Sequence, residues 1–226
     1  MQKVDEIIEK IGAHPLPNGF SDYELWLASD VKKYKPLVKF PRLYPNYFAL
    51  IITTIKGERV VLPMRYRLRP HWAEKDLPTK YNLHNARVDG LTHSRMWKGL
   101  FGKNHGLVGL IHFYEWIIAP ETGQKEQIIF YPEDQKVVWA PVLYDVWKPK
   151  EDSEVKAQLY TFSLITTEPP EHIVRMGKDR FPIALRVDRI DEWLNPSGKT
   201  PEDLLRILLD QEKRIFTHKH VKKTLD

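Results

Sequence analysis

The chain has 226 residues, of which 42% are hydrophobic and 29% charged, a composition typical of a globular protein and not of a disordered or fibrous one. It contains zero cysteines, which excludes a disulfide framework, a thiolate zinc site and a cysteine nucleophile. The N-terminal residues show no signal-peptide pattern, and the longest apolar run, over 47–55, is too short to span a bilayer as a helix. We therefore expect a cytoplasmic protein with no membrane partner.

Charge is unevenly distributed along the chain. The formal net charge is only +5, yet residues 31–106 hold 16 Lys and Arg against 4 Asp and Glu. Such a basic segment is typical of a protein that binds a polyanion such as nucleic acid, although a solvated basic face has the same composition. Charge alone leaves both interpretations open.

In the first part of the chain, apolar residues in an i, i+3, i+4, i+7 pattern predict an amphipathic helix over 4–11 that ends at Gly12. A loop rich in proline and lysine is expected to continue to about residue 44. Two apolar runs, 48–55 and 59–66, flank Lys-Gly-Glu and predict a β-hairpin.

Arginines alternate at the end of this hairpin and beyond it. Arg65, Arg67 and Arg69 would point to one face if the strand continues. A polar loop over 81–90 should follow, and then a short helix over 94–101.

Residues 106–116, GLVGLIHFYEW, predict a strand whose end places Glu115 between two aromatic side chains. Residues 127–131 and 136–147 predict a second hairpin, which turns at Pro-Glu-Asp. Two further strands are expected over 158–167 and 181–186.

The C-terminal part is predicted to be helical. One helix should cover 188–194, and a second should begin at Thr200 and Pro201, with Asp203 completing a capping box. Many strands linked by hairpins, with helices at the periphery, indicate an α+β fold.

Familiar catalytic motifs are absent from the sequence. It has no GxxxxGK[ST], GxGxxG or GxSxG stretch, which argues against nucleotide-binding folds and α/β-hydrolases. Among the nine histidines the only tight pair is His218 and His220, which lie in a basic tail. We therefore expect neither a metal site nor a cofactor.

Six blocks of residues, in order and spacing, resemble the SOS response-associated peptidase (SRAP) family, the abasic-site processing proteins. The blocks are LPMRYRLRPHW (62–72), HNARVDG (84–90), LVGLIHFYEW (107–116), APVLYDVW (140–147), FSLITTEPP (162–170) and KDRFPIAL (178–185). The resemblance covers about residues 40–195. It implies one compact domain over 1–226, with a curved, antiparallel, barrel-like sheet and peripheral helices. It also implies single-stranded DNA as the partner, and we expect a monomer.

The resemblance also assigns roles to individual residues. Glu115 matches the glutamate of the family's Phe-Tyr-Glu-Trp block and would move protons, unless it is a buried carboxylate paired with an arginine. Asn85 would position the sugar or the N-terminus, unless it only forms a turn. Arg87 and Arg180 would grip phosphate, unless they only pair with neighbouring aspartates. We add the alternating arginines to the predicted DNA-binding set: Arg65, Arg67 and Arg69.

The sequence departs from the family at two catalytic positions. Family members form a thiazolidine between an abasic-site aldehyde and an N-terminal cysteine, but this chain has Gln2 there and Lys178 in place of the family histidine. Two amines could still form an imine, the α-amine of Met1 and the side chain of Lys178. Whether the chain is an enzyme therefore stays open.

Three functions are compatible with the sequence. The first is an SRAP-like protein that binds single-stranded DNA and recognises or processes abasic sites, through a reversible Schiff base and not a thiazolidine. The imine could hydrolyse or promote β-elimination. The second is a non-catalytic DNA-binding or interaction module on a decayed SRAP scaffold. The third, a hydrolase for an unrelated substrate, has only Glu115 and scattered histidines in its favour.

Overall fold

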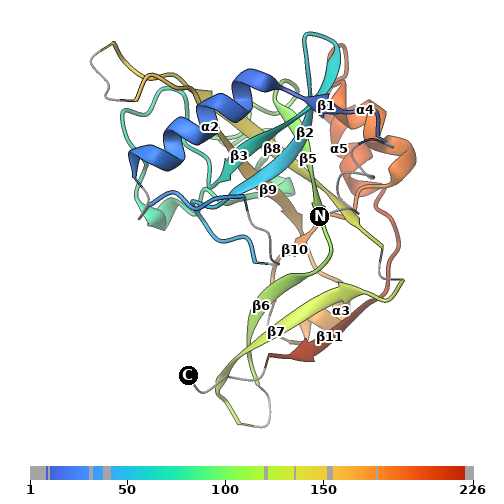
Figure 1. Cartoon of the computed structure of the whole chain (residues 1–226). Coiled ribbons are helices and arrows are strands. Elements are labelled where there is room, and N and C mark those ends of the chain that lie inside the picture. The colour runs from blue at the N-terminus through green and yellow to red at the C-terminus, as the bar shows by residue number, and fades with distance from the viewer. Residues whose placement is uncertain are drawn as a thin grey trace.

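The computed structural model describes residues 9, 11–30, 33–37, 42–119, 122–134, 136–151, 155–176 and 178–221. These residues form helices and strands in an α+β arrangement, as predicted (Figure 1). The helix expected over 4–11 lies almost entirely outside them.

Five strands close into a barrel: β2 (Phe48–Ile55), β3 (Glu58–Tyr66), β5 (His105–Leu110), β8 (Val138–Trp147) and β9 (Leu159–Thr167). They follow the order β3-β2-β5-β8-β9, and β9 pairs back with β3. The predicted hairpin of β2 and β3 is confirmed. The sheet is mixed and not purely antiparallel, because β3 and β9 run parallel where the barrel closes.

Three short strands extend the barrel sheet. β1 (His14–Pro15) runs parallel to β3, and β4 (Asn85–Arg87) runs parallel to β9. β10 (Phe181–Pro182) pairs antiparallel with β9 and is much shorter than the strand predicted over 181–186. β4 and β10 thus bring two of the six sequence blocks together on the same strand, β9.

Helix α2 (Pro17–Ser29) occupies the region predicted to be a loop, so that prediction was wrong. Proline fits the first turn of a helix, where its missing N–H has no intrahelical partner. The helix packs closely on the barrel at Gly19, where a Cβ atom would lie only 2.8 Å from Leu62. Glycine is therefore required for this approach.

The C-terminal helices are α4 (Ile190–Leu194) and α5 (Pro201–Leu209). The predicted capping box of α5 is confirmed, because the Thr200 hydroxyl accepts the Asp203 N–H at 3.1 Å and the Asp203 carboxylate accepts the Thr200 N–H at 3.1 Å. Among the described residues, further short helical turns cover α3 (Glu171–Val174) and the 3₁₀ segments Thr79–Tyr81, Val88–Gly90 and Val187–Arg189.

A buried histidine attaches α4 to the barrel. The Nδ1 of His105 donates to the Trp193 carbonyl at 2.9 Å, and its Nε2 accepts the Gly102 N–H at 2.9 Å. Its ring stacks on Trp193 with 3.7 Å between the centroids. Burial lowers the pKa of His105 to about 3, so the ring is neutral here, and a second proton would remove the acceptor for Gly102.

A second sheet, in the order β11-β7-β6, lies below the barrel in Figure 1. Its strands are β6 (Phe113–Ile118), β7 (Lys125–Pro132) and β11 (Phe216–His220). One side of this sheet packs on its own cluster of buried side chains, which includes Ile128 and Phe130. The strand β11 was not predicted, since its sequence, FTHKH, is mostly polar.

Two strand predictions around this sheet were wrong. The run 106–116 is not one strand, because it breaks at residues 111–112 into β5 of the barrel and β6 of the second sheet. The hairpin predicted over 127–147 does not form, because β7 pairs with β6 and β11 while β8 pairs with β5 and β9. The two halves of each segment thus pair in different sheets.

Residues 94–101 form successive turns in place of the predicted helix. The Phe101 N–H reaches the Trp97 carbonyl at 2.8 Å, but such bonds do not continue into a regular helix.

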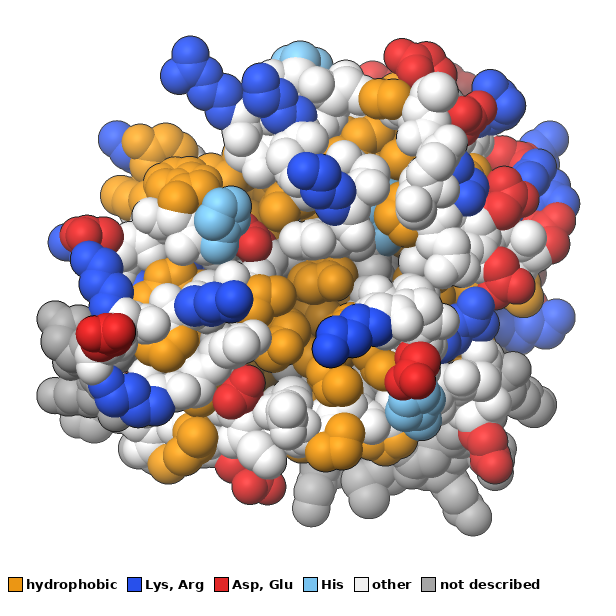
Figure 2. All heavy atoms as spheres, turned by 90° about the horizontal axis from the view of Figure 1, so that it is seen from above, with side chains coloured by type: hydrophobic (Ala, Val, Ile, Leu, Met, Phe, Trp, Pro, Cys, Tyr) orange, Lys and Arg blue, Asp and Glu red, His pale blue; other side chains and the backbone are white. Residues whose placement is uncertain are grey.

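No helix in the described part of the chain is long and apolar enough to cross a membrane. Seen from above, apolar side chains gather in the middle of the surface, with Lys and Arg side chains between and around them (Figure 2).

Candidate functional site

An ion pair links two of the predicted catalytic side chains, Lys178 and Glu115. The Nζ of Lys178 lies 2.7 Å from Oε2 of Glu115 and also donates to the Trp116 carbonyl at 2.9 Å. Glu115 comes from β6, and Lys178 precedes β10, the short strand paired with β9. The partner of Glu115 is thus a lysine and not the arginine of the structural alternative. The pair is accessible, with 18% of the lysine and 29% of the glutamate side chain exposed.

Tyr66 connects this pair to the next predicted residue, Asn85. The Tyr66 hydroxyl donates to Oδ1 of Asn85 at 3.2 Å. Burial raises the pKa of Tyr66, and the nearby charge of Glu115 raises it further. The phenol is therefore neutral and can donate this hydrogen bond. Glu115, Lys178 and Asn85 consequently lie in one region of the molecule.

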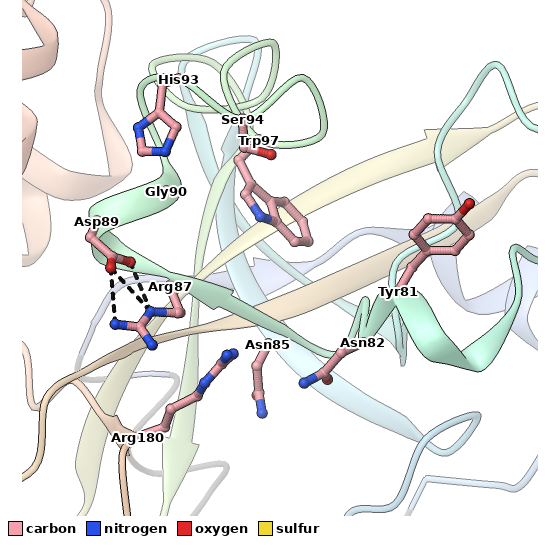
Figure 3. Close-up of a pocket in the computed structure, with 10 residues that line it drawn as sticks. All are labelled: Tyr81, Asn82, Asn85, Arg87, Asp89, Gly90, His93, Ser94, Trp97 and Arg180. Carbon is pink, nitrogen blue, oxygen red and sulfur yellow. Dashed lines mark hydrogen bonds and ion pairs between the residues drawn. The ribbon is translucent and has the colours of Figure 1, made fainter.

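A pocket of about 350 Å³ opens beside this region and contains both predicted phosphate-binding arginines (Figure 3). Arg180 extends toward Asn85, and Arg87 lies beside them. The complete lining is Tyr81, Asn82, Asn85, Arg87, Asp89, Gly90, His93, Ser94, Trp97 and Arg180.

Both pocket arginines also contact an aspartate, as the structural alternative proposed. Arg87 lies 2.9 Å from the Asp89 carboxylate, and the Nε of Arg180 lies 3.7 Å from Asp179. These carboxylates are 61% and 77% exposed, so solvent screens both contacts. The two arginines therefore remain accessible to an anion that enters the pocket.

Sequence reasoning overlooked His84 and Tyr66. The His84 ring lies 5.9 Å from the Tyr66 ring, centroid to centroid. Burial lowers the pKa of His84, and the positive charges of Arg67 and Arg180 lower it further. His84 directly precedes Asn85, and Tyr66 stands between two of the alternating arginines, so their positions in the quoted blocks could have drawn attention to them.

The alternating arginines do not share one face. The strand β3 ends at Tyr66, and the backbone at Arg67 has a φ of 95°, which breaks the alternation. Arg65 is fully buried and binds both oxygens of Asp76, at 2.9 and 2.6 Å. Arg69 is 6% exposed, and its guanidinium lies 3.7 Å from the centroid of the Trp147 ring.

The DNA contact predicted for Arg65 and Arg69 is therefore corrected, since both side chains are enclosed by the fold. Arg67 is partly buried and donates to the Leu77 carbonyl. All three arginines hold the segment that follows β3 in place. The basic composition of residues 31–106 thus overstates the charge that this segment offers to a polyanion.

Met1, the other predicted amine, lies outside the described residues. Among the residues that the structure describes, no group of three or more His, Cys, Asp or Glu side chains could hold a metal ion. Of the two predicted amines, the structure places that of Lys178 beside the Glu115 carboxylate.

Solved structures share this fold. A protein of Bacteroides thetaiotaomicron matches with a TM-score of 0.63 and 22% identity, over 78% of this chain and 74% of that one. A protein of Bordetella bronchiseptica matches with a TM-score of 0.63 and 16% identity, over 88% of this chain and 95% of that one. The overall fold of this chain therefore also occurs in solved proteins.

The family model described as SOS response associated peptidase (SRAP) matches residues 22–226, and the chain belongs to that family. It is 30% identical over 183 residues to the abasic site processing protein YoaM of Bacillus subtilis, covering 80% of this chain and 78% of YoaM. It is 26% identical over 187 residues to the abasic site processing protein HMCES of Pongo abelii, covering 71% of this chain. The alignment spans only 52% of that HMCES protein.

Proposed function

We propose that this protein binds single-stranded DNA at abasic sites and forms a reversible Schiff base between Lys178 and the exposed aldehyde. The observation that carries the proposal is the contact of 2.7 Å between Nζ of Lys178 and the Glu115 carboxylate. An amine that must gain and lose protons needs an acid-base group within hydrogen-bond reach. The relatives named as abasic site processing proteins support the choice of lesion.

Each step can use only the residues of this pair. One proton passes from the Lys178 ammonium to the Glu115 carboxylate, and the neutral amine attacks C1′ of the ring-opened sugar. A proton shift from nitrogen to oxygen gives the carbinolamine. The protonated Glu115 then returns its proton to the hydroxyl, which leaves as water while the nitrogen lone pair forms the C=N bond.

The resulting iminium has two fates. Addition of water at C1′ reverses the steps and releases the aldehyde and the amine. Loss of a proton from C2′ instead expels the 3′ phosphate by β-elimination, which would make the protein a lyase. Glu115 regains its charge when the iminium forms, so it is available as the base in either case.

The arginine-lined pocket supplies the contacts to DNA in this proposal. Arg87 and Arg180 carry guanidinium groups that match the geometry of phosphate oxygens, and neither is buried. Asn85, held by the Tyr66 hydroxyl, offers its amide nitrogen to the sugar or phosphate. Phosphate contacts fix the position of the strand without reading its sequence, which suits a protein directed to a lesion.

A second candidate is a DNA-binding module without covalent chemistry. The observation that favours it is that Nζ of Lys178 contacts two oxygens, from the Glu115 carboxylate and the Trp116 carbonyl. An ammonium held in this way also ties the segment before β10 to β6. This candidate predicts salt-sensitive binding that is indifferent to the lesion.

Borohydride trapping separates the two candidates. An oligonucleotide with one abasic site is mixed with the protein, and hydride reduction converts any imine to a stable secondary amine. We expect a trapped adduct with the unaltered protein and none with Lys178→Arg, which keeps the charge but cannot form the imine.

The matched control is Lys199→Arg, on the segment before α5. It should trap the lesion as the unaltered protein does. Trapping that persists in Lys178→Arg would reject Lys178 as the nucleophile. The absence of any adduct with the unaltered protein, together with equal affinity for intact DNA, would support the non-catalytic candidate.

A further inference from the structure

The second sheet has two sides of different character. Side chains alternate along its strands, and those of Phe113, Ile128 and Phe216 pack into the core below β6 and β7. The opposite side, here called the outer face, is formed by Tyr114, Trp116, Ile118, Lys125, Gln127, Ile129, Tyr131, Thr217 and Lys219.

The outer face leaves large side chains exposed to solvent. Trp116 is 49% exposed and Ile118 is 60% exposed. None of the nine side chains is buried, and none belongs to a hydrophobic cluster of the described residues. A sheet face that exposes aromatic side chains in this way is a candidate binding surface.

Each aromatic ring of the outer face has a cation beside it. The Nζ of Lys125 lies 5.2 Å from the centroid of the Trp116 ring, and that of Lys219 lies 5.4 Å from the Tyr131 centroid. The Tyr114 ring carries the Arg42 guanidinium at 4.1 Å.

Carboxylates of the same strands face the other way. Glu115 pairs with Lys178, and Glu126 accepts a hydrogen bond of 2.7 Å from Nδ1 of His220. The nine residues of the outer face include no Asp or Glu. The face is therefore aromatic and purely cationic, which fits a polyanion that also presents flat rings.

We propose that the outer face binds single-stranded nucleic acid, with bases stacked on Tyr114, Trp116 and Tyr131. Phosphates would lie against the cations beside these rings. Aromatic platforms flanked by basic side chains bind single strands with little sequence preference, because every base has a face that can stack. This inference rests on the proposed function, because the DNA bound at the outer face would be the same single strand that carries the abasic site.

The position of the outer face next to the reactive pair supports this assignment. Strand β6 carries Glu115 on one side and its direct neighbours, Tyr114 and Trp116, on the other. In this sheet β6 is an edge strand. Single-stranded DNA that leaves the pocket and passes around β6 would continue onto the aromatic rings. The surface would thus hold the DNA that flanks the lesion, and longer oligonucleotides would bind more tightly than short ones.

Length-dependent binding to lesion-free DNA tests the proposal. Fluorescence anisotropy would compare oligothymidylates of about 6 and about 20 nucleotides, lengths set by the size of single-strand platforms. The variant is Tyr131→Ala combined with Lys219→Glu. We expect it to lose about 10-fold or more in affinity for the longer strand and most of the advantage of length.

Two variants serve as controls. Lys213→Glu makes the same charge change in the same C-terminal segment, and Leu209→Ala shortens an apolar side chain of α5 that is 59% exposed. Both should keep the length advantage. Equal losses in the controls, or no loss in the double variant, would overturn the proposal. A double variant that binds normally but changes its sedimentation would identify the face as a contact between copies of the chain.

Photocrosslinking of the unaltered protein tests the same surface without a variant that must fold. An oligothymidylate with iodouracil at one position should crosslink to Tyr114, Trp116 or Tyr131, and crosslinks confined to other residues would contradict the proposal. Lesion trapping by the unaltered protein is a separate readout. If trapping succeeds while the outer face shows no crosslink, the further inference fails and the proposed function stands.

Discussion

Two ion pairs of this protein have similar contact distances but different surroundings: the inner pair, Arg65–Asp76, joins β3 to the segment that follows it, and the outer pair, Lys178–Glu115, lies at β6. Arg65 is fully buried and grips Asp76, which is 13% exposed and also binds Lys33 at 2.8 Å. Lys178 and Glu115 are both partly exposed, and Arg180, two residues after Lys178, lines the basic pocket. The inner pair holds the chain after β3, whereas the outer pair is partly open to solvent.

Burial explains why the inner pair is structural. Burial alone would raise the pKa of Asp76, but hydrogen bonds and charge from Arg65 and Lys33 outweigh it and hold the pKa well below its usual range. A carboxylate whose pKa is held this low does not take up a proton near neutral pH, so it is a poor proton carrier. The Lys178–Glu115 pair is instead partly open to solvent, so a substrate atom can come within hydrogen-bond reach of Glu115.

The largest expected effect comes from breaking the inner pair. Arg65→Met should lower the free energy of unfolding by about 3 to 5 kcal/mol, because it leaves Asp76 buried without its main partner. Lys178→Met, its counterpart in the outer pair, should lower it by less than about 1 kcal/mol. Urea denaturation measures both. Similar losses in the two variants would contradict the distinction between the pairs.

The next effect concerns chemistry at the outer pair. Glu115→Gln should lower the rate of borohydride trapping by about 100-fold, because the amide cannot carry a proton to the carbinolamine. Glu126→Gln is the matched control, since Glu126 is also in an ion pair and lies on the neighbouring strand. A trapping rate that falls equally in both variants would point to a general effect on the sheet.

The pH dependence of stability should reflect the buried His105. The folded pKa of His105, about 3, lies below the value of about 6.5 expected for the unfolded chain, so the unfolded state binds more protons between them. Its contribution to stability is thus complete above about pH 6.5 and lost as the pH falls toward 3, by up to about 1.4 kcal/mol per pH unit.

Replacing this histidine isolates its contribution. His105→Gln should flatten the dependence of the unfolding free energy on pH between about 6.5 and 4, whatever it does to the stability at neutral pH. His93→Gln, at an exposed histidine, should leave the slope unchanged. Urea unfolding at several pH values provides the comparison, and an unaltered slope in His105→Gln would contradict the neutral, buried imidazole.

The smallest effect concerns phosphate contacts at the pocket. Arg180→Gln should weaken DNA binding for every sequence and reduce the slope of log affinity against log salt by about 1. Arg206→Gln, at an exposed arginine of α5, should leave this slope unchanged. Titrations at several salt concentrations measure both, and equal slopes in the two variants would exclude Arg180 from the interface.

Turns and helix caps that depend on residues close together in the sequence could be predicted from local patterns. The hairpin of β2 and β3 and the capping box at Thr200 follow from turn and cap chemistry within a few positions. The six sequence blocks also marked Glu115, Asn85 and Lys178, and the structure brings these side chains together. Their chemical roles remain predictions.

Contacts between distant parts of the chain could not be predicted in this way. The alternation of Arg65, Arg67 and Arg69 carries no sign that Asp76 will bury the first of them. The run 106–116 is largely apolar, and only the pairing of its two halves with different strands reveals that it belongs to two sheets. The polar strand β11 forms because β7 offers an edge, which its own sequence does not indicate.

The most direct test of the account is to locate the adduct on the unaltered protein. After borohydride reduction of the complex with an abasic-site oligonucleotide, nuclease and protease digestion followed by mass spectrometry identifies the modified residue. We predict the modification on Lys178, beside Glu115. A modification found only at another amine, including the α-amine of Met1, would contradict the assignment of Lys178 as the nucleophile.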